Sequence, residues 1–335
     1  EDRDFNGVPE IAASNRSDFV YEAKRQAVIS ARPDLLTLVK EPLGGETKIA
    51  YSYQKLLDEP DIHTPFVTVA SVETYDGRRS RGKTSFSYSN GRWNWPERMF
   101  LGFEKVTAVL PKIAGESTGP KVETVYRQDL ATLGKIASVT RFDGAGKALE
   151  KVEETYETQL ARKPYQALNT RTLKTVTFSD GVRKVQVDRT FDRFGNVTSE
   201  TNLGDLAKPA DDRLRKISYA VNPEAYIVNT PAIEFTYAGT SDALGNSEQV
   251  TSYIYDGAGE TMVPPVKGLL TKVEHAAGVR NQAHAGATAR VAFVRSYDAQ
   301  GNLVSEADGA GNTTRYVYDG TYKLFPVEKQ LPAFG

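Results

Sequence analysis

The sequence lacks cysteine altogether. This absence excludes disulfide bonds, thiol nucleophiles and zinc–thiolate sites, and it is compatible with either an intracellular or an exported protein that packing alone stabilises. Histidine is scarce as well, because the chain contains only three, His63, His275 and His284. None of them forms a pair at the spacing of metal ligands, so we expect surface or loop histidines rather than a shared metal site.

Neither sign of charge is in excess, since the chain contains 42 basic and 43 acidic residues. No basic block interrupts this balance, so we expect no nucleic-acid partner and no binding to anionic membranes. The sequence also has no signal-peptide pattern and no apolar run long enough to span a bilayer. It begins at Glu1 without a methionine. We therefore expect the chain to be an excised piece of a longer protein, and we expect the rest of that protein to be one of its partners.

A repeat is present near the C-terminus. The aromatic-Asp pair Tyr297-Asp298 recurs as Tyr318-Asp319, and the Gly-Asn corners at Gly301 and Gly311 lie between runs of alternating apolar and polar residues. Gly-Asn supplies the positive φ that a short hairpin turn requires. Each unit is therefore interpreted as strand, tight turn, strand. One hairpin cannot bury its apolar face alone, so the units must stand side by side in an extended sheet.

Earlier copies of the aromatic-Asp pair are spaced irregularly, as if most units held insertions. They are Tyr75-Asp76, Phe142-Asp143, Phe191-Asp192 and Tyr255-Asp256, each followed by a nearby glycine. We predict that the residues of all these pairs, together with Gly301, have a structural role in the repeat. From Lys121 onward the chain is a succession of strand patterns with Thr, Lys, Glu and Arg at the exposed positions, which is typical of a sheet wetted by solvent.

The rest of the chain favours the same fold class. Residues 32–53 alternate around Gly44-Gly45 as a hairpin does. Residues 17–32 are the best helical candidate, and Pro33 ends that segment. Two polar interruptions, 204–215 and 278–288, are predicted surface loops, the first with one helical turn. The prediction is an all-β protein, an extended curved antiparallel sheet of stacked hairpins with a minor helix near the N-terminus.

Two segments hold candidate ligand sites. The N-terminal stretch places oxygen donors at alternate positions around Gly7, which suits a candidate calcium loop. Its residues are Asp2, Asp4, Asn6, Val8 and Glu10. We expect no other cofactor. The most aromatic segment contains Trp93, Trp95, Phe100 and Phe103. These rings could form a surface on which sugars stack, but they are more often part of a core, because large aromatic side chains usually bury their area.

Nothing in the sequence predicts catalysis. The adjacent acids Glu153-Glu154 and Asp211-Asp212 would point to opposite faces of a strand. Spacings of Gly-x-Ser-x-Gly, Walker and zincin motifs are absent. We therefore expect a non-enzymatic protein. A glycan-cleaving site would instead need two carboxylates facing each other across a groove of about 5–10 Å, which the sequence alone does not reveal.

Three ordered segments carry a resemblance to the Rhs/YD-repeat family, and specifically to B components of insecticidal Tc toxin complexes and relatives that begin with a SpvB-like region. Residues 32–45 resemble the family's "RPDLLT…GG" hairpin. Residues 97–106 resemble its "EREFRGFGRV" motif, with Met99 and Leu101 where Glu and Arg are usual. Residues 297–326 resemble its YD repeats and its "YDxTYxxFP" element. These segments occur in the family's order, and together they span nearly the whole chain.

The resemblance implies a bacterial, secreted or cell-surface virulence protein. In that family a β-propeller precedes a hollow β-shell of YD repeats that encloses a cytotoxic polypeptide. Residues 1–31 would then be the end of a propeller-like region and a linker, residues 32–120 a middle region, and residues 121–335 the first strands of the shell. The implied function is non-catalytic encapsulation and delivery of a toxic cargo. The alternative is a cell-surface adhesion or carbohydrate-binding β-module of a YD-repeat protein.

Overall fold

The computed structural model describes residues 35–54, 66–112, 115–277 and 290–332. Within these ranges the chain forms 19 β-strands and no α-helix. The strands are β1 (Leu38–Lys40), β2 (Glu46–Gln54), β3 (Phe66–Tyr75), β4 (Arg81–Asn94), β5 (Met99–Val109), β6 (Lys121–Tyr126), β7 (Ile136–Phe142), β8 (Ala148–Gln159), β9 (Gln166–Thr177), β10 (Val182–Phe191), β11 (Val197–Asp205), β12 (Arg213–Tyr219), β13 (Pro231–Ala238), β14 (Ser247–Tyr255), β15 (Leu270–Ala277), β16 (Arg290–Tyr297), β17 (Leu303–Asp308), β18 (Thr313–Tyr318) and β19 (Pro326–Gln330).

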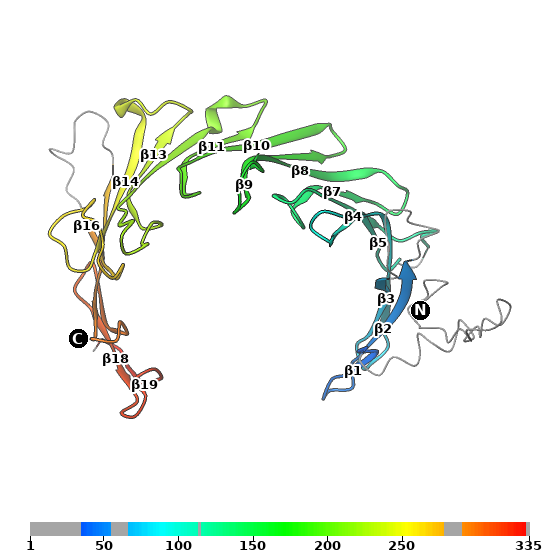
Figure 1. Cartoon of the computed structure of the whole chain (residues 1–335), viewed down its shortest axis with the longest axis horizontal. Helices are drawn as coiled ribbons and strands as arrows, with labels where there is room; N and C mark the ends of the chain where they lie inside the picture. The colour runs from blue at the N-terminus through cyan, green and yellow to red at the C-terminus, as the bar shows by residue number, and fades with distance from the viewer. Residues whose placement is uncertain (1–34, 55–65, 113–114, 278–289, 333–335) are drawn as a thin grey trace. The chain divides into compact units, whose positions relative to one another are not determined.

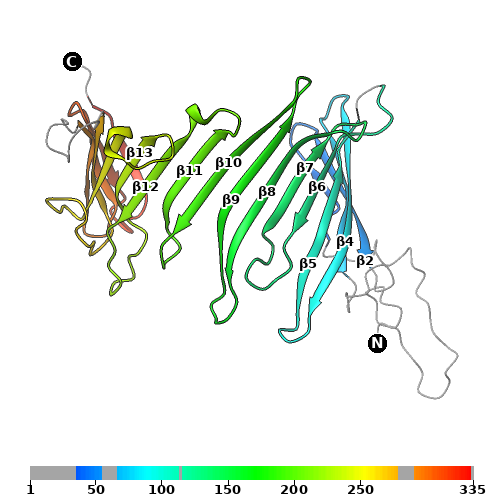
Figure 2. The same ribbon diagram turned by 90° about the horizontal axis from the view of Figure 1, so that it is seen from above.

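The chain divides into two compact units, Glu1–Arg183 and Lys184–Gly335. In the first unit, strands β1 to β9 pair antiparallel in chain order, each with the next. In the second unit, strands β10 to β19 follow the same rule. Each unit is therefore an antiparallel meander. Figure 1 labels most of the strands, and Figure 2 shows β4 to β9 of the first unit lying side by side.

The first hairpin has the predicted position. Strands β1 and β2 pair from Leu38 with Lys48 to Lys40 with Glu46. Gly44 adopts a φ of +89° in the turn between them, which only glycine reaches at low cost. Gly77, in the turn after β3, packs directly against this turn, because a Cβ added to it would lie 2.8 Å from the carbonyl carbon of Gly44.

Few side chains of the first unit are buried. Among its described residues, Leu101 in β5 is the single buried hydrophobic residue, and Ser71 and Thr132 are buried polar ones. Most strand positions are half-buried instead, as in β6, where all six residues have intermediate exposure. A single-layer sheet explains this pattern, because each face packs only against neighbouring side chains and has no second layer above it.

The second unit has a more substantial core, because long connections fold back over its sheet. The buried hydrophobic residues are Leu214, Ile217, Ala220, Ala232, Tyr237, Val250, Ile254, Tyr255 and Val273. The connections 220–230 and 256–269 supply the cover. In the first of them the side-chain amide of Asn222 donates to the carbonyl of Pro265 at 2.9 Å, and in the second the Thr261 hydroxyl donates to the carbonyl of Ala232 at 2.7 Å. Pro265 is itself fully buried.

These observations confirm the all-β class and the extended antiparallel sheet of hairpins. In the loop predicted at 204–215, a 3-10 helix spans Pro209–Asp211, which confirms the predicted helical turn. Strands β11 and β12 occupy the two ends of that range. The helix predicted at 17–32 and the loop predicted at 278–288 lie outside the described residues. The predicted boundaries at 31/32 and 120/121 stay predictions; the division into compact units falls at 183/184.

Val250 and Val266 test the core assignment with the same substitution. Val250 in β14 is 6% exposed, whereas Val266 in the connection after β14 is 73% exposed. We expect Val250→Ala to lower the free energy of unfolding by about 1.5–3 kcal/mol, since two methyl groups leave a packed site. Val266→Ala should change it by less than about 0.5 kcal/mol. Urea unfolding followed by circular dichroism measures both, and equal effects would contradict the assignment.

Candidate functional site

Four corners of the sheet share one construction. In each, an Asp side chain accepts backbone N–H bonds from residues two and four positions later, and a glycine three positions later adopts a positive φ. Asp298 accepts from Gln300 at 3.0 Å and from Asn302 at 2.8 Å, while Gly301 has a φ of +89°. The other three corners begin at Asp143, Asp192 and Asp308. The carboxylate therefore satisfies amide groups that the strand ladder leaves unpaired.

In two of the Gly-Asn pairs the asparagine has a second role that the sequence did not reveal. The side-chain amide of Asn302 donates to Asp298 at 2.9 Å and also to the backbone carbonyl of Lys323 at 2.7 Å, which is 21 residues away. Asn196 does the same with Asp192 at 2.9 Å and with the carbonyl of Val228 at 2.6 Å. Each asparagine thus closes its own corner and ties it to the loop after the next hairpin.

Two aspartates of the repeat close longer connections. Asp256 accepts four backbone N–H bonds from residues 266 to 269, which close the connection after β14. Asp319 accepts from Thr321, Tyr322, Leu324 and Phe325 in the connection after β18. The amides of Phe325 and Tyr322, with those of Leu324 and Lys323, lower the pKa of Asp319 from 3.8 to about 2 and outweigh the opposing effect of desolvation.

The Asp corners of the second unit gather mainly at one edge of its sheet. Asp192, Asp256, Asp298 and Asp319 follow β10, β14, β16 and β18. Alternate strands of an antiparallel meander run in the same direction, so they end at the same edge, by which we mean one of the two sides of the sheet that the strand ends form. Asp308, the last residue of β17, lies at the opposite edge. One long edge of this unit is therefore a row of carboxylate-closed loops.

The tyrosine of the pair has a defined role at Tyr255, Tyr297 and Tyr318, whereas the hydroxyl of Tyr75 donates to the carbonyl of Arg78 in its own turn at 3.0 Å. The hydroxyl of Tyr297, at the end of β16, donates to the carbonyl of Leu270 at the start of β15, at 2.8 Å. The same bond joins the end of one strand to the start of the strand before it at Tyr219, Tyr255 and Tyr318. Tyr156, inside β8, bonds in the same way to Ile136 at the start of β7. Burial raises the pKa of Tyr255 to about 12. In the pairs Phe142-Asp143 and Phe191-Asp192 the aromatic residue is phenylalanine, which has no hydroxyl to donate.

A β-bulge lies opposite each tyrosine that bonds to the start of the preceding strand, and it lies in the strand that follows. The pairing register shifts between Ser296 and Tyr297, and equivalent shifts precede the tyrosines that end β12, β14 and β18. In β8 the shift lies between Thr155 and Tyr156. A bulge adds one residue to one strand of a pair, and here the extra residue belongs to the following strand, as Val304 does in β17. The hydroxyl bonds to the preceding strand instead, so each of these tyrosines has a bulge on one side and its own hydrogen bond on the other.

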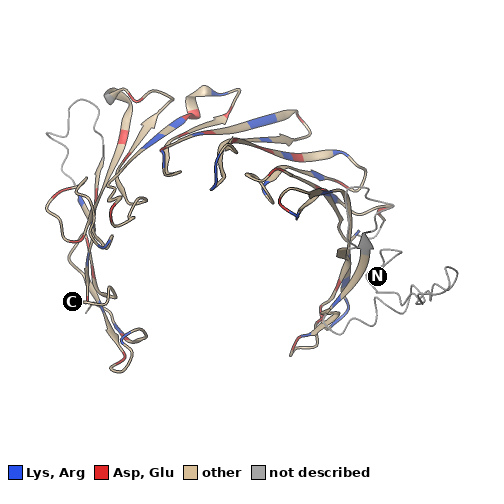
Figure 3. Ribbon diagram, in the orientation of Figure 1, with Lys and Arg blue, Asp and Glu red and all other residues tan. Residues whose placement is uncertain are grey.

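Charged side chains of the strands pair with one another across the sheet. In the second unit Arg189 and Glu200 lie 2.9 Å apart, and Arg295 and Glu306 lie 2.6 Å apart. Arg215, opposite Glu200 in the register, is 2.7 Å from Glu234 on the next strand. In the first unit Glu150 accepts from both Arg141 and Lys174. Figure 3 shows both signs of charge interspersed along the strands, so the sheet faces are charged but locally neutral.

The aromatic segment separates into two groups. Phe100 stacks on Phe66 with ring centroids 4.1 Å apart, and its edge meets Phe103, which also contacts Tyr88. These phenylalanines therefore pack mainly against other rings. Trp95 is different, because it is 62% exposed. Trp93 and Trp95 meet edge to face at a centroid distance of 6.5 Å.

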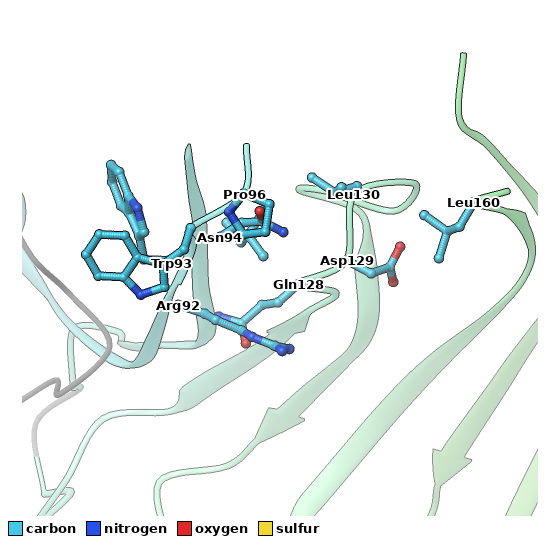
Figure 4. A pocket seen from close by; sticks show the side chains of 10 residues that line it. Arg92, Trp93, Asn94, Pro96, Gln128, Asp129, Leu130 and Leu160 are labelled. Carbon is cyan, nitrogen blue, oxygen red and sulfur yellow. The ribbon is translucent and has the colours of Figure 1, made fainter. Parts of the chain in front are cut away.

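The two tryptophans line a cleft of about 410 Å³ in the first unit. Figure 4 shows its lining, with Trp93 and Leu160 on opposite sides and Gln128 and Asp129 between them. Burial alone would raise the pKa of Asp129, but bonds from the Thr132 hydroxyl and from nearby backbone amides outweigh that effect and lower it. The grouping of Trp93 with Trp95 was predicted from the sequence, but the contribution of residues 128–130 and 160 was not, since they lie far along the chain.

The remaining candidate ligands have few described partners. The candidate calcium residues Asp2, Asp4, Asn6, Val8 and Glu10, together with His63 and His284, lie outside the described residues. His275 in β15 has its Nδ1 atom 3.0 Å from the hydroxyl of Thr251. Within the part of the chain that the structure describes, no three His, Cys, Asp or Glu side chains are grouped so as to hold a metal ion, and no helix is long and apolar enough to cross a membrane.

Comparison with known families and structures agrees with the repeat geometry. Residues 4–134 match the family described as the insecticide toxin TcdB middle/N-terminal region, and residues 297–328 match the RHS repeat. No curated protein matches the chain. Among solved structures, the crystal structure of TcdB2-TccC3 matches with a TM-score of 0.61 at 13% identity and that of TcdB2-TccC3-Cdc42 with 0.62 at 12%. The Photorhabdus luminescens Tc holotoxin pore, with a mutated TccC3, matches with a TM-score of 0.60 at 12% identity.

Each of these solved structures covers 89% of this chain, which spans only 23–24% of the matched chains. The two family matches cover residues 4–134 and 297–328, so over these ranges the chain is similar to Rhs/YD-repeat proteins, and its closed aromatic-Asp corners agree with that similarity. Within that class the chain is similar to the B component of Tc toxins, since its N-terminal part matches the TcdB middle region.

Tyr297→Phe tests the tyrosine bond. Removing the hydroxyl leaves the carbonyl of Leu270 without its side-chain donor, so we expect the free energy of unfolding to fall by about 0.5–1.5 kcal/mol. Tyr226→Phe is the matched control, because Tyr226 is 82% exposed and should change by less than about 0.5 kcal/mol. Urea unfolding measures both variants, and an unaffected Tyr297→Phe would show that the hydroxyl is dispensable.

The lowered pKa of Asp319 predicts a specific acid dependence. A carboxyl group whose pKa falls from 3.8 to about 2 on folding stabilises the folded state above pH 3.8, and this contribution is lost as the pH falls through 2. Asp319→Asn should therefore be less stable than the parent protein at pH 5, and the difference should shrink toward pH 2. Urea midpoints across this pH range measure the difference. A difference that stays constant would contradict the role of Asp319.

Proposed function

We propose that this chain is a non-catalytic structural segment of an Rhs/Tc-type toxin, which helps to form a hollow β-shell that encapsulates and delivers a toxic cargo polypeptide. The observation that carries the proposal is the repeated corner. Because an Asp carboxylate within each corner closes it, a strand can be added to the meander without a second sheet to stabilise its turn. Such a construction suits a wall that is one sheet thick.

The chemistry of the sheet faces supports the same proposal. A surface that encloses a polypeptide chain must remain wet and must not bind that chain tightly. Arg–Glu pairs such as Arg189–Glu200 and Arg295–Glu306 neutralise each other, so neither sign of charge is left to attract an unfolded segment. Ser296 and Ser305 pair their hydroxyls at 2.6 Å. A face of this kind is polar without being adhesive.

The acidic residues favour a structural role over a catalytic one. Glu153 lies 2.6 Å from Lys151, and Glu154 accepts from Asn169 and Thr172, each at 2.7 Å. Lys174 and Arg141 lower the pKa of Glu150. A general acid would need a raised pKa. Glu150 is instead held in its charged form by donors on the neighbouring strands β7 and β9.

This proposal implies two partners. The first is the rest of a longer polypeptide, which contains a propeller and the remaining shell, and the second is the enclosed cargo. The similar solved structures contain TcdB2 together with TccC3, and the same kind of partnership is proposed here. On this proposal the protein is bacterial, and it is secreted or held at the cell surface. The boundaries proposed for its regions are residues 1–31, 32–120 and 121–335.

Single cysteines test the shell, because the natural chain contains none. Thr313 and Thr314 are adjacent in β18, and Thr314 pairs with Glu306 while Thr313 pairs with Ala307, so their side chains point to opposite faces. Thr313→Cys and Thr314→Cys would be prepared in this chain and in the longer protein that we infer contains it. Their rates of reaction with a bulky polyethylene-glycol maleimide would then be measured.

In a shell, one face is sealed from large reagents and the other is not. We expect both cysteines to react in the isolated chain. In the longer protein one of them should react at least about tenfold more slowly, which corresponds to about 1.4 kcal/mol. The neighbouring cysteine is the matched control, since it shares the backbone position and the chemistry. If both cysteines stay equally reactive, or if both become protected, the sheet is not the wall of a hollow shell.

A further inference from the structure

Three connections of the first unit meet at one edge of its sheet and form the cleft of Figure 4. They are the turn between β4 and β5, which contains Trp95 and Pro96, the connection between β6 and β7, which contains residues 128–130, and the connection after β8, which contains Leu160. Lys163 lies 2.9 Å from Glu97, so an ion pair joins the first and third connections. The volume of about 410 Å³ is in the range of small-molecule sites, roughly 300–1,000 Å³.

The apolar side of the cleft presents an exposed indole. Trp95 keeps 62% of its surface accessible, although large aromatic residues generally bury most of theirs. Its contact with Trp93 is edge to face, at an interplanar angle of 65°. Such a contact supports one ring against the other, while most of the surface of Trp95 stays accessible. Indole faces bind the C–H side of rings that are otherwise polar.

The polar side of the cleft offers donors and acceptors together. Among the described residues, Arg92 has no ion-pair partner, and the Asn94 side chain uses its oxygen to accept from the amide of Glu97 at 3.0 Å, which leaves its N–H groups available. Gln128 uses its N–H groups on the carbonyls of Asn90 and Gly102, at 2.7 and 2.8 Å, so its carbonyl oxygen remains an acceptor. Asp129 adds a carboxylate.

We propose that this cleft is a binding site for a saccharide, with a pyranose ring stacked on Trp95 and its hydroxyl groups bonded to Arg92, Asn94 and Asp129. A hydroxyl group donates and accepts at once, so it matches a lining that holds both a guanidinium and a carboxylate. An anionic ligand would meet the Asp129 carboxylate, and a cationic ligand would meet Arg92. The proposal does not depend on the shell, because the whole cleft lies within the first unit.

The two tryptophans provide the measurement, since the whole chain has only two and both line the cleft. Intrinsic fluorescence of the complete chain would be titrated with the methyl α-pyranosides of glucose, galactose and mannose, from micromolar to tens of millimolar concentration. Sorbitol, an open-chain polyol without a ring to stack, is the ligand control. We expect a saturable change in fluorescence with at least one pyranoside and no saturable change with sorbitol.

Variants separate the stacking surface from the polar groups. Trp95→Ala and Arg92→Ala should each raise the midpoint of the titration about tenfold or more, and isothermal calorimetry provides the readout that does not rely on Trp95. Tyr226→Ala and Arg79→Ala are the controls, since they remove an exposed aromatic residue and an exposed arginine at other places, and they should leave the midpoint unchanged. Circular dichroism confirms that each variant is folded.

Three results would overturn the proposal. The first is no saturable change with any of the pyranosides. The second is an equal response to sorbitol, which would indicate a solvent effect on the exposed indole. The third is binding that persists unchanged in folded Trp95→Ala and Arg92→Ala, which would place the sugar elsewhere on the chain.

Discussion

The bond from an Asp carboxylate to the backbone amides of its own corner is the interaction on which this structure depends. A meander that is one sheet thick has no second layer to satisfy or position its turns. A charged acceptor within the turn does both, because charge-assisted hydrogen bonds are stronger than neutral ones and because closing the turn sets the register of the next strand. Corners as different in length as those of Asp298 and Asp256 are closed by this same bond.

The tyrosines compensate for the small core. With Leu101 as the single buried hydrophobic residue among those described in the first unit, apolar burial alone gives each strand little reason to stay in place. The hydroxyl of Tyr156 in β8 donates to the carbonyl of Ile136, at 3.0 Å, and so fastens β8 to the start of β7. In the second unit the folded-back connections around Pro265 supplement these bonds with a real core.

Local patterns predicted most of the fold, because the signals that specify it are local. The Gly-Asn corner at Gly301 and the alternating strands around it need only a few consecutive residues to specify a turn and its hairpin. The hairpin around Gly44 was predictable for the same reason. The cleft was only half predictable. Trp93 and Trp95 are conspicuous in the sequence, but Leu160 and Asp129 reach them only because the meander brings successive turns to one edge.

By itself, the sequence determined the all-β class, the positions of the aromatic-Asp corners and the near balance of charge, since each follows from residue types within a short window. Only the tertiary structure decided which groups those residues serve. Asn302 bonds to Lys323, and Asp256 to Leu269, because pairing of the strands brings distant loops together. It also decided that Trp95 is exposed while Phe100 is stacked on Phe66. Exposure depends on what packs above a ring, and no short stretch of sequence contains that information.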